Sequence, residues 1–118
     1  MYKSCKQILP NLNIHLLIAI LSIMGALLRW KLNTNFVSNI VGCALIGLIS
    51  GLKLNSKLKL AFAIGFCGSL TTFSGWIWDF VGFFKSGFVI QAFSELFSTL
   101  FAGFFFLSLG FWFGKTIK

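Results

Sequence analysis

A run of glycine and hydroxyl residues interrupts an apolar segment near the middle of the chain. It reads Gly65-Phe66-Cys67-Gly68-Ser69-Leu70-Thr71-Thr72-Phe73-Ser74. In a bilayer core, backbone N–H and C=O groups must be satisfied internally, so irregular backbone survives only where it is buried in protein or lines a water-filled cavity. The run therefore predicts a transmembrane helix that is broken in mid-membrane and that forms part of a pore or an ion site.

Other polar side chains in apolar stretches are candidates for the same site. The amide of Asn39 both donates and accepts hydrogen bonds, which favours a position facing protein or water over one facing lipid. Arg29 ends the first apolar stretch, where two roles stay open: snorkelling to the headgroups, or drawing an anion toward a pore mouth. The hydroxyls of Thr71 and Thr72 can bond back to helical carbonyls. The nearby glycines make an unwound backbone the better interpretation.

The composition predicts an all-α integral membrane protein. The chain has 118 residues, of which 58% are hydrophobic and 10% are charged, whereas about a quarter of the residues in a soluble domain are charged. A helix needs about 20 mostly apolar residues to cross the hydrocarbon. Four stretches qualify, at about 12–28, 36–52, 60–84 and 88–113, joined by short links. We expect residues 1–118 to form a single four-helix transmembrane domain.

Several other classes of protein are disfavoured. Cys5, Cys43 and Cys67 cannot all pair within one chain, and His15 is the only histidine, so neither a disulfide framework nor a cysteine–histidine metal site is indicated. We see no nucleophile–base pair, so we expect no enzyme. The basic residues flank the spans, where anionic lipid attracts them, so we expect no nucleic-acid partner. A cleaved signal peptide is disfavoured because Arg29 closes the first run directly.

Small residues on two of the expected helices predict close helix packing. Gly47 and Gly51 lie four residues apart in the second stretch, and Gly110 and Gly114 repeat this spacing in the fourth. Such spacing lets two helix backbones approach closely. The glycines serve either packing within one chain or association between chains, and the sequence favours neither. Four helices do not easily enclose a polar pathway alone, which favours an oligomer.

The basic residues are distributed unequally between the two sides of the expected four-helix arrangement. Seven of the ten lie on the side of the termini and the second link: Lys3, Lys6, Lys53, Lys57, Lys59, Lys115 and Lys118. Arg29, Lys31 and Lys85 lie on the other side. Positive residues are retained on the cytoplasmic side. We therefore expect both termini to lie in the cytoplasm.

Three segments resemble, in order and spacing, the signatures of the CrcB/Fluc fluoride channels. They are Gly25-Ala26-Leu27-Leu28-Arg29, then Asn39-x-x-Gly42, then the run from Gly65 to Ser74. The resemblance covers about the first three helices, and the fourth fits by length and position. It implies a bacterial-type channel that lies in the cytoplasmic membrane and exports fluoride passively. It also implies an antiparallel dimer with two pores and a structural sodium ion at the dimer centre.

The resemblance also implies residue roles. Gly68 and Thr71 would give backbone carbonyls to the sodium ion. Phe73 would present to fluoride its ring edge, which is the positive part of an aromatic quadrupole. Asn39 would donate a hydrogen bond in the pore, and Arg29 would add positive potential near an entrance.

Further positions extend the expected pathway or depart from the family pattern. Thr72 and Ser74 would continue a polar path beside Phe73. Trp76 stands where the family usually has a second pore phenylalanine. The only tyrosine is Tyr2, so the fourth helix lacks the family's usual tyrosine. The remaining hydroxyl candidates on that helix are Ser98, Thr99 and Ser108.

The assembly has alternatives at this stage. The charge bias favours one fixed orientation of the chain in the membrane. The family that the chain resembles includes members that work as two unlike subunits of opposite orientation. The partner is therefore either a second copy of this chain or a paralogue. A non-conducting accessory subunit of such a pair is a further alternative. A small multidrug-type exporter is less favoured, because it depends on an acidic residue in the first span and 12–28 contains none.

Overall fold

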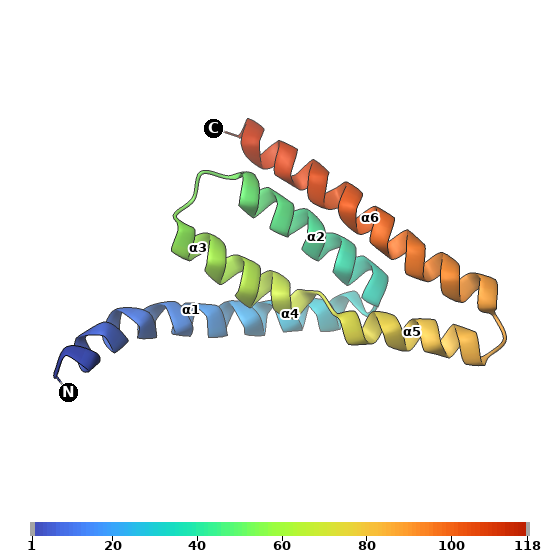
Figure 1. The fold of residues 1–118 in the computed structure, drawn as a ribbon, viewed down its shortest axis with the longest axis horizontal. Helices are drawn as coiled ribbons and strands as arrows, with labels where there is room; N and C mark the ends of the chain where they lie inside the picture. Colours follow the sequence, from blue (N-terminus) through green and yellow to red (C-terminus); the bar gives the residue numbers. More distant parts are fainter. Residues whose placement is uncertain (1, 118) are drawn as a thin grey trace.

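The computed structural model describes the backbone of residues 2–117 and the side chains of residues 13–117. Over this range the chain forms four long helical segments and no strand (Figure 1). They are α1 (Tyr2–Leu32), α2 (Asn35–Gly51), a composite third segment and α6 (Val89–Thr116). The third segment consists of α3 (Ser56–Leu60), η1 (Ala61–Cys67), α4 (Gly68–Leu70) and α5 (Phe73–Lys85). The expected all-α membrane fold with a broken third helix is confirmed.

Length and apolar composition qualify three segments to cross a membrane. They are Asn13–Leu32, Ser56–Lys85 and Val89–Thr116. The fourth, α2, is apolar but has 17 residues, which gives a helix of about 26 Å at a rise of about 1.5 Å per residue. The molecule is therefore a multi-pass membrane protein, and α2 is the shortest of its four long helical segments. The helix α1 begins at Tyr2, ahead of the expected apolar start near residue 12.

Short links fix how consecutive segments meet. Asn33 adopts a φ of 54° between α1 and α2, a left-handed conformation that asparagine tolerates better than most residues. Gly87, at φ 81°, turns the chain between α5 and α6. The side chain of Asn55 accepts a hydrogen bond from the N–H of Lys57 at 3.0 Å and so caps α3.

Glycine contacts hold α2 against α6 within one chain. A methyl group at Gly47 would overlap the carbonyl oxygen of Leu107, and one at Gly110 would overlap that of Ala44. Both helices end at the same end of the molecule (Figure 1). Packing within the chain, the first of the two alternatives left open by the glycine spacing, is thus what the structure shows.

The N-terminal half of the third segment, which includes η1 and α4, packs on α1. A methyl group at Gly65 would come within 2.8 Å of the carbonyl oxygen of Ile18, so the two backbones nearly touch there. Ala61 to Cys67 form a π-helix, a rare geometry that concentrates at functional sites and shifts the face presented by the following residues. The sequence pattern did not predict this stretch.

Candidate functional site

The third segment breaks at two threonines. Thr71 has φ −79° and ψ 154°, and Thr72 has φ −145° and ψ 122°, so both are extended between α4 and α5. Gly68, by contrast, is helical at φ −63° and ψ −32°. The expectation of a mid-helix break is confirmed, and its position is at the threonines. The helix continues through Gly68 to Leu70, so the unwound backbone starts after the glycine.

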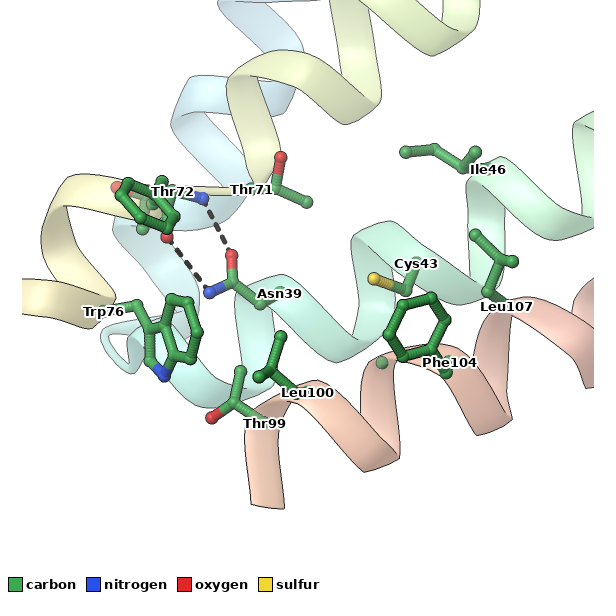
Figure 2. A pocket seen from close by; sticks show the side chains of 12 residues that line it. Asn39, Cys43, Ile46, Thr71, Thr72, Trp76, Thr99, Leu100, Phe104 and Leu107 are labelled. Carbon is green, nitrogen blue, oxygen red and sulfur yellow. Dashed lines mark hydrogen bonds between the residues drawn. The ribbon is translucent and has the colours of Figure 1, made fainter. Parts of the chain in front are cut away.

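The side chain of Asn39 pairs with the peptide groups of the break. Its Oδ1 accepts a hydrogen bond from the N–H of Thr72 at 2.8 Å, and its Nδ2 donates to the carbonyl of Thr72 at 3.1 Å (Figure 2). A primary amide has two N–H donors, so one remains after this pairing. Asn39 therefore replaces the helical partners that Thr72 has lost.

The break redirects the N–H groups that would otherwise close the helix. The carbonyl of Gly68 would accept from the N–H of Thr72, but that N–H donates to Asn39. The carbonyl of Thr71 would accept from the N–H of Gly75, which donates instead to the hydroxyl of Thr72 at 3.1 Å. The last carbonyls of a helix have no intrahelical partner and need another. Gly68 and Thr71 thus carry carbonyl oxygens that are released from the helix.

A cavity of about 340 Å³ opens beside the break. The lining includes five residues of the sequence-based site, Asn39, Thr71, Thr72, Phe73 and Trp76, which lie on α2, at the break and on α5 (Figure 2). None of the described residues that line it carries a charge. Hydrogen-bond donors act strongly in such low-dielectric surroundings.

Phe73 and Trp76 sit one turn apart at the start of α5. Their ring centroids are 5.6 Å apart and their planes meet at 69°, an edge-to-face pair. Phe73 is 72% exposed, whereas Trp76 is 8% exposed. The hydroxyl of Ser74 lies 3.4 Å from that of Thr72. At the start of α5 the cavity thus has one exposed aromatic ring, one buried indole and the hydroxyl of Thr72, with the hydroxyl of Ser74 beside it but outside the lining.

Three candidate residues lie outside this cavity lining. Gly68 and Ser74 flank the break and are exposed. Arg29 lies in the last turn of α1 and lines a separate polar pocket with Asn35 and Ser38. The amide of Asn35 donates to the carboxylate of Asp79 at 2.7 Å, which ties the start of α2 to α5. The structure therefore separates an arginine-lined pocket from the cavity at the break.

The sequence did not reveal most of the α6 side of the cavity. Thr99, a candidate hydroxyl from the sequence, lines it, together with Leu100, Gly103, Phe104 and Leu107. The other two hydroxyl candidates, Ser98 and Ser108, are exposed and donate to carbonyls of their own helix. The i, i+4 spacing of Thr99 and Gly103 was the available signal, but it does not say which face of a largely apolar helix turns inward.

The thirteen-residue helix α5 also begins at this cavity, so its first turn adds partial positive charge. Spare amide and indole N–H groups and an aromatic edge suit a small anion. Released carbonyl oxygens at the break suit a hard cation. The site can therefore hold opposite charges on two nearby surfaces without a charged side chain in its lining.

Comparison with known proteins agrees with these features. The profile of the family described as CrcB-like protein, Camphor Resistance (CrcB), matches residues 16–111. A protein of Prochlorococcus marinus named Fluoride-specific ion channel FluC 1 is 52% identical over 97 residues, covering 82% of this chain and 78% of the relative. A Synechococcus protein named Fluoride-specific ion channel FluC 2 is 38% identical over 107 residues, covering 86% and 80% respectively. Another Synechococcus protein with that name is 37% identical over 118 residues, covering 92% and 89%.

Proposed function

This chain belongs to the CrcB-like family, and we propose that it is a subunit of a fluoride-selective channel that lets fluoride leave the cytoplasm passively. The single observation that carries the proposal is the break at Thr71 and Thr72, held open by the Asn39 amide beside an uncharged cavity. The names of the relatives point to the same ion.

The geometry supports a specific way of handling the anion. Phe73 is exposed at the cavity, and its ring edge offers positive electrostatic potential without a hydrated charge. The spare N–H of Asn39 and the hydroxyls of Thr72 and Ser74 offer hydrogen bonds in series. Because fluoride is a small, strongly hydrated anion, donors in this order replace its water one step at a time. Arg29, in its separate pocket, raises the potential near an entrance.

We further propose that Gly68 and Thr71 give their carbonyl oxygens to a structural sodium ion. Both carbonyls have lost their helical donors, and oxygen atoms are the ligands that hard cations prefer. Gly68 lies on the exposed surface of the single chain, where a second chain can add further oxygens. The ion would supply positive charge that joins two antiparallel chains.

The assembly we propose is a dimer in the cytoplasmic membrane. The start of α1, the link between α2 and α3 and the end of α6 lie toward one end of the long axis (Figure 1), which is the end richer in lysine. A fixed orientation with cytoplasmic termini follows from the positive-inside rule. This favours a partner chain of opposite orientation over a second copy.

Fluoride efflux from liposomes tests the proposal. Vesicles loaded with fluoride and chloride are reconstituted with this chain, alone and together with a second CrcB-like chain of opposite charge bias. A potassium ionophore then lets potassium follow, so that no membrane potential builds up to oppose further fluoride efflux. We expect rapid fluoride release with chloride retained. Release no faster than from protein-free vesicles in both preparations would show that the proposed function is wrong.

A further inference from the structure

The indole N–H of Trp76 is a buried donor without an acceptor. Trp76 is 92% buried by side-chain and backbone area together, since 8% remains exposed. Within the described residues 2–117, no acceptor bonds its Nε1 atom. A buried tryptophan N–H normally finds a partner, because leaving such a group unpaired in the interior is unfavourable. Its partner is therefore a species other than the described chain.

The position of this donor narrows the choice of partner. Trp76 lines the same cavity as Asn39 and Phe73, and Figure 2 shows its indole nitrogen on the side of the ring turned toward Thr99 in that view. The hydroxyl proton of Thr99 is already donated to the carbonyl of Glu95 at 2.8 Å. An indole N–H donates and does not accept, so it suits an anion and repels a cation.

Three groups at this cavity thus offer positive potential, one from α2 and two from α5. They are the indole N–H of Trp76, the spare amide N–H of Asn39 and the ring of Phe73, which packs edge-to-face with the indole. None of the described lining residues carries a negative charge to compete for these donors. Hydrogen bonds to a charged partner are worth more than neutral ones.

We propose that the indole N–H of Trp76 donates a hydrogen bond to fluoride inside this cavity, one helical turn beyond Phe73. This inference rests on the proposed channel function. It adds a hydrogen-bond donor, the Trp76 N–H, next to the aromatic ring of Phe73 at the start of α5. The chain would hold the anion there by a hydrogen bond as well as by a ring edge. Fluoride would therefore bind more tightly at this position than at a site formed by aromatic ring edges alone.

Nuclear magnetic resonance of the indole groups tests the inference directly. The full-length chain, in the assembly that conducts in the efflux assay, is labelled with ¹⁵N-tryptophan in lipid nanodiscs. It is titrated with sodium fluoride and, in parallel, with sodium chloride. The resonance that disappears in Trp76→Phe belongs to Trp76. We expect it to shift downfield with fluoride and not with chloride.

Transport gives an independent readout. Losing one hydrogen bond to a charged partner, worth about 1.5–3 kcal/mol, should raise the half-saturating fluoride concentration of Trp76→Phe at least ten-fold, on the order of one decade per 1.4 kcal/mol. Flux at saturating fluoride should persist, since a phenyl ring still fills the position. Trp78→Phe is the matched control, because Trp78 lies two residues away on α5 and is 78% exposed. It should change neither quantity.

The outcomes separate this inference from the channel function. If the wild-type assembly conducts fluoride while the Trp76 resonance stays fixed or responds equally to both halides, the N–H bonds water or another chain and the inference is wrong. An unchanged half-saturating concentration in Trp76→Phe would overturn it as well. If the wild-type assembly shows no fluoride efflux, the proposed channel function is wrong, and the inference about Trp76 is wrong with it.

Discussion

Replacing Asn39 by aspartate is expected to slow fluoride efflux about a hundred-fold. A carboxylate at this position still accepts the 2.8 Å hydrogen bond from the N–H of Thr72. It cannot donate to the Thr72 carbonyl, which lies 3.1 Å from the amide nitrogen. The variant thus exchanges one hydrogen bond for a negative charge at the cavity wall.

The expected losses of stability and of flux have different sizes. A hydrogen bond between helices in a membrane contributes about 0.6 to 1 kcal/mol, so losing one changes the free energy of unfolding by about 1 kcal/mol. Two like unit charges about 6 Å apart repel by about 3 kcal/mol at an effective dielectric constant of about 20. That repulsion corresponds to about two decades in rate. The added charge therefore dominates the effect on flux.

Asn39→Ala separates the two effects. It removes both hydrogen bonds to Thr72 and adds no charge. We expect it to lose about 2 kcal/mol of stability and to conduct better than the aspartate variant, because its cavity wall carries no charge. Comparing the two variants therefore isolates the effect of the charge on flux from the effect of the lost hydrogen bonds.

The assay pairs fluoride efflux from liposomes with thermal unfolding of the same preparations. Gln91→Glu is the matched control, since Gln91 is an exposed amide near the start of α6 and its replacement makes the same chemical change away from the cavity. It should leave efflux and unfolding near wild type. Equal efflux from the aspartate and alanine variants would contradict the role given to the charge.

Three further predictions follow from the site and the packing. Phe73→Ile should slow fluoride efflux at least about ten-fold because it removes the aromatic edge, whereas Phe101→Ile on the exposed face of α6 should not; equal rates would exclude the ring from the pathway. Gly110→Val should lower the free energy of unfolding by about 3 kcal/mol, because its side chain meets the backbone of α2. Gly82→Ala, which meets nothing within 4 Å, should leave the free energy of unfolding the same or raise it by up to about 1 kcal/mol, and a similar loss in both variants would contradict the packing. A topology reporter fused after Lys118 should report the cytoplasm, and equal signals on both sides would favour a homodimer of dual topology.

The helix count and the broken third helix were predictable because they depend on composition and on one dense motif. Apolar length sets where a chain can cross a membrane, and the two adjacent threonines after Gly68 mark where the helix stops. The amide of Asn39 was also identifiable, since an amide in an apolar span needs a partner. Its partner, the peptide of Thr72, follows from the packing of α2 and is absent from any local pattern.

The remaining features depend on contacts between distant segments. The π-helix from Ala61 to Cys67 forms where Gly65 meets the backbone of α1, and no local pattern distinguishes it from an α-helix. Gly68 stays helical beside the break, and a methyl group there would meet only the carbonyl oxygen of Ala63, at an ordinary 3.6 Å. Substitution by alanine at Gly68 is therefore compatible with the backbone of this chain.

The pairing of Asn39 with Thr72 also has a consequence for biogenesis. Unsatisfied peptide groups in the hydrocarbon are costly, so the substitute partners that Asn39 supplies stabilise the interruption of the third segment. The ribosome makes α2 before it makes Thr72. We expect the nascent third segment to enter the bilayer as an uninterrupted helix and to open at the threonines only when α2 docks, so that the order of synthesis delivers the partner first.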